Sequence, residues 1–288
     1  MRLNPIAVLS EKPSPVGAEA GVDAVPVEIG PLDPLYKLWS VLGAWPIAIG
    51  MMSVAAGTSL PLSLLIPFEK TMKALPQPIM GAVPAIALSK RRITYHADFD
   101  PKRVSMFLMN HTSVLDAHVA CWAIPHAFCG VQHQHHFDVP VYGWLMKRGN
   151  GIGVIKGKEG QAQWVADQVR DRARRGISIL GFPEGRRTQN GRILPFRKGL
   201  LIMARDGGLP VVPLAVRGLW QILRKGEWVV RPHTLDVYVG PQIETQGLDD
   251  AQIEQLAAKL HRFTSDYVER GILGNANDLR DSTKLQRR

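Results

Sequence analysis

Residues 106–123 read MFLMNHTSVLDAHVACWA, and the change of pattern within this stretch decides the fold. The first four residues are apolar, as in a buried strand, and a more polar segment from Asn110 to Asp116 follows them. The apolar run after Asp116 predicts a helix. A strand, a loop and a helix in succession form the repeating unit of an α/β sheet.

Short apolar runs and helical patterns continue to alternate toward the C-terminus. Strands are predicted at residues 106–109, 128–131, 152–155, 177–182 and 211–216, and two more are marked by Val229, Val230, Val237 and Val239. Helices are predicted at residues 161–175, 198–205 and 249–270. We therefore expect an α/β fold whose mixed, largely parallel sheet is flanked by helices.

An uncharged, apolar run precedes this domain at residues 38–68. It is longer than the roughly 20 residues that one membrane crossing needs. Pro46, Pro61 and Pro67 would kink or stop a helix, so a bent or re-entrant helix pair fits better than one straight span. The run predicts an N-terminal membrane-embedded helical segment, and a buried hairpin of a soluble protein is the alternative.

The composition divides the chain into five segments. Residues 1–33 predict a flexible leader, and residues 34–68 form the membrane-embedded helical segment. A basic interfacial connector follows at residues 69–103, then the α/β domain at 104–274 and a flexible basic tail at 275–288. The Lys and Arg residues after the apolar run predict that the α/β domain faces the cytoplasm.

Basic residues outnumber acidic ones, with 35 Lys and Arg against 25 Asp and Glu, and the pI is near 9.8. Such a surface attracts phosphate groups, whether on nucleic acid, on anionic lipid or on coenzyme A, and charge alone does not choose among them. The two cysteines, Cys121 and Cys129, are too few for a disulfide framework, so reduced thiols are expected.

His111 and Asp116 are the candidate catalytic pair. Positions five apart on an ideal helix are rotated by roughly 140° from each other, so these side chains meet only if His111 precedes the helix. With Ser113 as the N-cap, Asp116 is the third helical residue, and an upstream loop residue can fold back onto its carboxylate. An Asp bound to one imidazole nitrogen leaves the other free as a base. The spacing by itself fits a capping carboxylate beside an ordinary loop histidine no less well.

A second informative turn, GFPEGRRT at residues 181–188, lies at the carboxyl end of a predicted strand. Ligands of open α/β sheets bind at such ends. The two adjacent guanidinium groups of Arg186 and Arg187 suit a phosphate, because each can bind a pair of oxygens. The turn therefore indicates a phosphate-binding site.

Together with PFRKG at residues 195–199 and LPVVPL at 209–214, these stretches resemble the ordered motifs of the glycerolipid acyltransferase family over roughly residues 107–241. The resemblance identifies His111 and Asp116 as catalytic. It implies that the acceptor substrate is bound by seven residues: Asn110, Glu184, Gly185, Arg186, Arg187, Thr188 and Lys156. It places the acyl end of the site at Val212, Pro213 and Leu214.

The chain departs from the family pattern at two of these positions. Arg186 stands where the family has Thr, and the run GIGVIKG at residues 151–157 lacks the Arg that ends the family's second motif. Lys156 can supply the charge of that Arg but not its bidentate fork. Both departures concern the part of the site that would bind the acceptor head group.

The resemblance implies transfer of a fatty acyl group from acyl-CoA or acyl carrier protein to the free hydroxyl of 1-acylglycerol 3-phosphate. His111 would act as general base, with no metal and no cofactor besides the thioester co-substrate. The expected partners are membrane lipids, the acyl donor and a lysophospholipid, and no nucleic acid. The alternatives are another lysophospholipid or aminolipid acceptor, or a basic membrane-binding protein without catalysis.

The histidine-rich stretch QHQHH at residues 132–136 looks like a metal cluster, since neutral imidazoles bind zinc. Its place before the PVYGW run at residues 140–144 favours a surface or acyl-entry loop instead.

Overall fold

The computed structural model describes residues 23–27, 29–139, 142–155 and 160–284, and its described part is built on a seven-stranded sheet. The strand order is β1-β7-β6-β2-β5-β3-β4. The strands are β1 (Arg91–Tyr95), β2 (Met106–Met109), β3 (Phe128–His133), β4 (Ile152–Val154), β5 (Ser178–Gly181), β6 (Val211–Arg217) and β7 (Leu235–Val239). All neighbouring pairs are parallel except β6 and β7. The predicted α/β class with a mixed, largely parallel sheet is confirmed.

Strand β2 lies at the centre of the sheet and is buried on both faces, which explains its uninterrupted apolar sequence. Met106 and Leu108 contribute to one hydrophobic core, and Phe107 and Met109 contribute to another. This alternation follows from the two-residue period of a strand, and it divides the molecule into two layers around the sheet.

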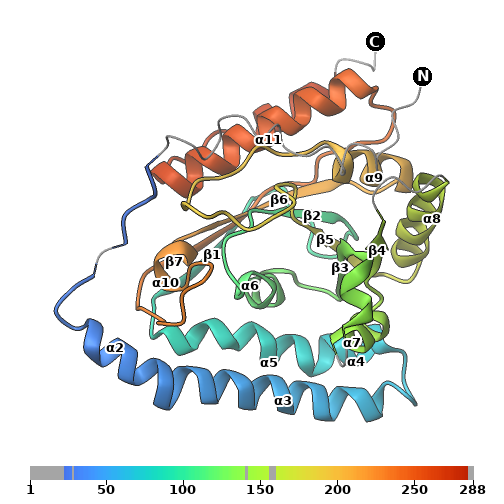
Figure 1. The fold of residues 1–288 in the computed structure, drawn as a ribbon. Coiled ribbons are helices and arrows are strands. Elements are labelled where there is room, and N and C mark those ends of the chain that lie inside the picture. The colour runs from blue at the N-terminus through green and yellow to red at the C-terminus, as the bar shows by residue number, and fades with distance from the viewer. Residues whose placement is uncertain (1–22, 28, 140–141, 156–159, 285–288) are drawn as a thin grey trace.

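Helices α8 (Gln161–Arg174), α9 (Gly199–Gly207) and α11 (Asp250–Arg270) cover one face of the sheet. Helices α6 (Asp116–Ala123) and α10 (Leu219–Ile222) cover the other, and α5 (Pro76–Ala82) packs outside α6, as Figure 1 shows. A Cβ atom at Gly81 would lie 3.0 Å from the backbone of Trp122, so glycine permits the close approach of α5 to α6. Shorter elements are η2 (Val83–Ala87), η3 (Gln134–Asp138) and α7 (Tyr142–Arg148).

The apolar run forms one long helix and not the predicted helix pair. Elements α2 (Asp33–Trp39), η1 (Ser40–Ala44) and α3 (Trp45–Leu62) follow one another as a single helix of 30 residues. Pro46 follows the π-helical turn η1 closely and Pro61 is the penultimate residue of α3, so the helix continues through both prolines. Within the described residues, this helix is the one that is long and apolar enough to cross a membrane, and only 28% of its most apolar window is buried.

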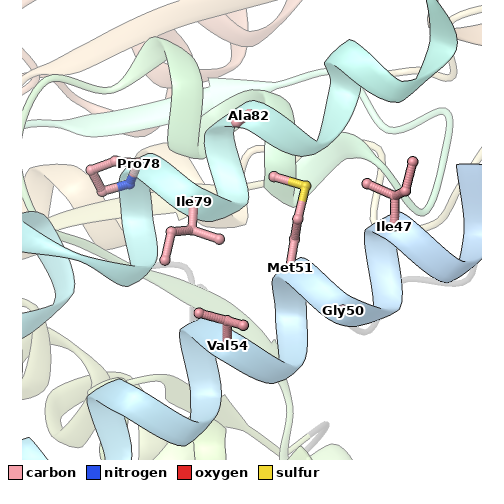
Figure 2. Close-up of a pocket in the computed structure, with 7 residues that line it drawn as sticks. All are labelled: Ile47, Gly50, Met51, Val54, Pro78, Ile79 and Ala82. Atoms are coloured by element: carbon pink, nitrogen blue, oxygen red, sulfur yellow. The ribbon is translucent and has the colours of Figure 1, made fainter.

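The partner of this helix comes from the basic connector. Helix α4 (Phe68–Ala74) and helix α5 lead the chain back along α3, and α5 runs beside α3 in Figure 1. Between α3 and α5 lies a groove of about 640 Å³ that is lined entirely by apolar residues (Figure 2). These residues are Ile47, Gly50, Met51, Val54, Pro78, Ile79 and Ala82.

Three contacts attach the apolar helix to the loop after α10. The guanidinium of Arg231 pairs with the carboxylate of Asp33 at 2.7 Å, and both side chains are less than one-tenth exposed. The backbone N–H of Val230 donates to the Ser40 hydroxyl at 2.9 Å. The Trp45 indole N–H donates to the Trp228 carbonyl at 2.7 Å. The helix is therefore fastened to the α/β domain and not merely connected to it by a linker.

The structure changes three of the predicted boundaries. Strand β1 pairs with β7, so the sheet begins inside the 69–103 connector. Residues 229–230 form no strand, and β7 alone occupies that part of the sheet. Helix α12 (Asn277–Lys284) lies in the predicted tail, and its Leu279 is buried. The end of the predicted leader is also in contact with the domain, since the Val25 N–H donates to the Asn190 carbonyl at 2.7 Å.

Candidate active site

Two loops meet at the carboxyl edge of the sheet because the strands that precede them are parallel neighbours. Strand β2 pairs with β5, so the loop after β2 and the loop after β5 begin side by side. The first carries His111 and Asp116, and the second runs from Phe182 to Arg197. The two sequence motifs are thereby brought into one site.

The predicted pairing of His111 with Asp116 is present. The imidazole Nδ1 lies 2.6 Å from Asp116 Oδ2, which also accepts the backbone N–H groups of Thr112 at 2.8 Å and Ser113 at 2.9 Å. Asp116 is 2% exposed, whereas the His111 side chain is 24% exposed. Nδ1 must carry the proton to donate to the carboxylate, which leaves Nε2 as the acceptor nitrogen. Among the described residues, nothing is bonded to Nε2.

The helix start differs from the prediction, although the pairing is the same. Helix α6 begins at Asp116 with Leu115 as its N-cap, so the prediction of Ser113 as N-cap was wrong. The Ser113 hydroxyl instead accepts the N–H of Leu115 at 3.2 Å. Asp116 thus lies in the first turn, where the helix dipole favours a negative charge, and its carboxylate still reaches back to His111.

Glu184 supports His111 through the backbone. One carboxylate oxygen accepts the His111 N–H at 2.6 Å, and the other accepts the Leu194 N–H at 2.8 Å. The side chain is 2% exposed, and burial raises the pKa of this carboxyl to about 8, while the two N–H donors oppose that rise. We predicted Glu184 among the substrate-binding residues, but both of its oxygens are used to position the loops.

The turn at residues 184–188 is bonded to His111 at both ends. Glu184 accepts the His111 N–H, and the Thr188 N–H donates to the His111 carbonyl at 2.9 Å. Gly185 in this turn has φ of +73°, which favours glycine. Phe182, just before the turn, stacks on the imidazole with ring centroids 3.9 Å apart and planes inclined by 19°. No sequence pattern indicates this stacking, because a Phe at a strand end is just as common in a hydrophobic core.

Asn110 and Thr188 are buried residues that hold the loops in place. The Asn110 amide donates to the Val216 carbonyl at 3.0 Å and accepts the Val216 N–H at 2.8 Å, which joins the end of β2 to β6. The Thr188 hydroxyl donates to the side chain of Asn190 at 3.1 Å and accepts the Gly191 N–H at 3.1 Å. These contacts explain both residues without a substrate.

Other predicted residues are placed as follows. Arg186 is exposed and Arg187 half-buried, both on the turn that bonds to His111. Lys156 lies outside the described residues. Val212, Pro213 and Leu214 are buried within β6, and Val212 and Leu214 belong to the core on the α6 side of the sheet. Their predicted contact with an acyl chain stays a prediction.

The backbone around His111 limits where an oxyanion could be stabilised. The N–H of His111 donates to Glu184, and those of Thr112 and Ser113 donate to Asp116. These three donors are therefore occupied, and a developing negative charge on a substrate needs donors from elsewhere.

The histidine-rich stretch gathers three imidazoles without forming a metal site. The rings of His133 and His135 have centroids 4.5 Å apart, and those of His135 and His136 have centroids 4.1 Å apart. In the part of the chain that the structure describes, no group of three His, Cys, Asp or Glu residues could hold a metal ion. Burial and the two neighbouring imidazoles lower the pKa of His136.

Comparison with known proteins finds one family model and several curated proteins that are similar to this chain. Residues 91–217 match the family model described as Acyltransferase. A 1-acyl-sn-glycerol-3-phosphate acyltransferase of Limnanthes douglasii is 30% identical over 161 residues, which are 56% of this chain and 57% of that protein. The beta form of the same enzyme from Homo sapiens is 25% identical over 169 residues, which are 57% of this chain and 61% of that protein. The chain thus spans little more than half the length of these curated relatives.

The fold has also been seen before. The crystal structure of the 1-acyl-sn-glycerophosphate acyltransferase of Thermotoga maritima matches with a TM-score of 0.65 and 18% identity, over 83% of this chain and 95% of that one. The two proteins share the sheet and its helical layers.

Proposed function

We propose that this chain, whose residues 91–217 match the Acyltransferase family model, acylates the free hydroxyl of 1-acylglycerol 3-phosphate to give phosphatidic acid. The names of the relatives from Limnanthes and Homo sapiens support this acceptor. The observation that carries the proposal is an imidazole whose Nδ1 is held by a buried carboxylate while Nε2 is left open.

The reaction needs no protein nucleophile. Nε2 of His111 removes the proton of the acceptor hydroxyl as its oxygen attacks the thioester carbonyl carbon. The tetrahedral adduct collapses, the carbon–sulfur bond breaks, and the thiolate leaves with the proton from the imidazolium. Asp116 stabilises the imidazolium and keeps its ring in place, and the stacked Phe182 restricts the tilt of the ring.

The acceptor phosphate is assigned to the turn that bonds to His111. Arg186 and Arg187 lie there, and guanidinium groups bind phosphate oxygens bidentately. The donor is a fatty acyl thioester of coenzyme A or of acyl carrier protein, both of which present phosphate or carboxylate charges to the basic chain.

The apolar helix associates with a membrane, with the α/β domain on its cytoplasmic face. The support is a set of large apolar side chains that stay exposed along α2, η1, α3 and the turn that follows. They are Leu35, Leu38, Val41, Leu42, Ile47, Ile49, Val54, Leu62, Leu64, Leu65 and Ile66. A lysophospholipid already resides in such a membrane.

The test is acyl transfer by the detergent-purified protein, with acyl-CoA and acyl carrier protein donors and a panel of lysophospholipid acceptors. We expect phosphatidic acid from 1-acylglycerol 3-phosphate, and its formation at a rate roughly 10³-fold lower with the His111→Ala variant. Equal transfer by wild type and variant would refute the mechanism.

The exposed Arg186 favours a second candidate, a different anionic lysophospholipid as the preferred acceptor. A higher kcat/KM for such a lipid than for 1-acylglycerol 3-phosphate would select it. If wild type binds vesicles but transfers no acyl group to any acceptor, the chain is a membrane-binding protein without catalysis.

A further inference from the structure

We infer that Arg197 is a specificity-determining residue of the proposed acceptor site, where its guanidinium binds the phosphate together with the turn at residues 184–188. Arg197 lies between β5 and α9, ten residues beyond Arg187. The inference deepens the proposed function and rests on it.

The backbone places Arg197 beside the turn. Its N–H donates to the Pro183 carbonyl at 2.9 Å, and three residues earlier the Leu194 N–H donates to Glu184 at 2.8 Å. The segment 194–197 therefore runs along the base of the turn, held at two points. Because Glu184 also accepts the His111 N–H, Arg197 belongs to the same hydrogen-bonded unit as the catalytic base.

The side chain of Arg197 lies over Gly185. A Cβ atom placed on Gly185 would be 3.4 Å from both Cζ and Nε of the guanidinium and 3.5 Å from its Nη1. The half-buried guanidinium thus covers the backbone between Glu184 and Arg186. Arg186 and Arg187 belong to the same short turn, whose two ends bond to His111.

The neighbouring cations are directed elsewhere. The Lys198 ammonium lies 3.0 Å from a Glu254 oxygen, and Arg192 lies 3.1 Å from a Glu269 oxygen, so both are paired with α11. Arg197 is the residue of this segment that is directed onto the turn. A guanidinium there adds a planar fork, and a phosphomonoester has three terminal oxygens to accept it.

The chemistry predicts discrimination by head-group charge. A phosphomonoester such as 1-acylglycerol 3-phosphate carries up to two negative charges, a phosphodiester carries one, and a monoacylglycerol carries none. Contact with Arg197 strengthens binding of the first most and of the last not at all.

The experiment compares Arg197→Ala, Arg197→Lys and the matched control Lys198→Met by steady-state kinetics on these three acceptor classes. We expect Arg197→Ala to raise KM for 1-acylglycerol 3-phosphate at least about 10-fold, equivalent to about 1.4 kcal/mol, with kcat within about 3-fold. The rate with monoacylglycerol should not change. Arg197→Lys should recover part of the loss, and Lys198→Met should match wild type.

An unchanged KM in Arg197→Ala, or an equal loss with monoacylglycerol, would overturn the inference and leave Arg197 a structural residue. Failure of the proposed function looks different, because wild type would then acylate no acceptor. In that case calorimetry with glycerol 3-phosphate tests the inference. Binding that is at least 10-fold weaker in Arg197→Ala than in wild type supports it. Equal binding by the two proteins, or no binding by wild type, overturns it.

Discussion

Two histidines lie at opposite ends of the same pair of strands, β2 and β5. Among the described residues, only one of the two has a ring nitrogen without a hydrogen-bond partner. At the amino edge, His126 bonds through Nδ1 to the Pro101 carbonyl at 3.1 Å and through Nε2 to the Ser178 hydroxyl. At the carboxyl edge, His111 bonds through Nδ1 alone. Burial also lowers the pKa of His126. An imidazole fixed at both nitrogens holds the sheet together, whereas one fixed at a single nitrogen can accept a proton.

The largest effect should come from replacing each histidine by alanine. His111→Ala should lower kcat by roughly 10³-fold, within the usual range for loss of a general base, and leave the melting temperature nearly unchanged. His126→Ala should do the reverse, lowering stability by roughly 1 kcal/mol while kcat stays within about 3-fold. Activity assays and thermal melts of the two variants test this contrast. An equal loss of activity in both variants would contradict it.

Asp116→Asn should have the next largest effect, of roughly 10²-fold on kcat. All three donors bond to Oδ2, so the asparagine oxygen can keep the contacts with Nδ1 and with the N–H groups of Thr112 and Ser113. What is lost is the negative charge that stabilises the imidazolium in the transition state. A fall in kcat with unchanged KM is expected, and a change confined to KM would contradict the assigned role.

Glu184→Gln should lower kcat by roughly 10-fold and stability by about 1–3 kcal/mol. Each carboxyl oxygen of Glu184 accepts one N–H group, whereas glutamine must place its own N–H₂ against the N–H of His111 or of Leu194. Denaturant unfolding and kinetics would measure both losses. If Glu184 instead contacts the acceptor, as its place in the motif suggested, KM would rise and stability would hold.

The smallest effect is a difference in how the two edges respond to pH. Burial raises the pKa of Glu184 from 4.5 to about 8, so between these values the native state holds more protons and its stability falls as pH rises. The lowered pKa of His126 acts oppositely: below pH 6.5 the unfolded chain binds the proton first, and stability falls as pH falls. Between pH 5 and 8, the free energy of unfolding of Glu184→Gln should lose the first pH dependence and that of His126→Gln the second. Each slope is at most about 1.4 kcal/mol per pH unit. If the free energy of unfolding of both variants changed with pH in the same way, the two edges of the sheet would not differ in their response to pH.

Much of the fold follows from the sequence because the central strands are buried on both faces. The runs at 106–109 and 211–216 are apolar throughout, and both are strands. Strand β1 escaped prediction because it lies at the sheet edge, where Arg91 and Arg92 interrupt any apolar run. The helix pair was wrong because Pro46 and Pro61 were expected to kink or stop helices, whereas the helix continues through both.

The site was predictable where its contacts are local. His111 and Asp116 are five positions apart, and their spacing already required a loop followed by a helix. Glu184 bonds to a residue 73 positions away, so its positioning role is set by the pairing of β2 with β5 and not by any local pattern. For the same reason the contact of Arg197 with Gly185 appears only in three dimensions.

Through the ion pair of Asp33 with Arg231, the proposed membrane helix sets the height of the active site relative to the membrane. A catalytic domain joined to its membrane helix by a flexible linker would reach hydroxyl groups at many heights above the membrane. The α/β domain is attached directly to this helix, so the depth of α3 in the membrane sets the height of His111 relative to the membrane surface. If α3 lies in a bilayer as proposed, the position of a lipid's hydroxyl group relative to the membrane contributes to acceptor specificity, together with the chemistry of its head group.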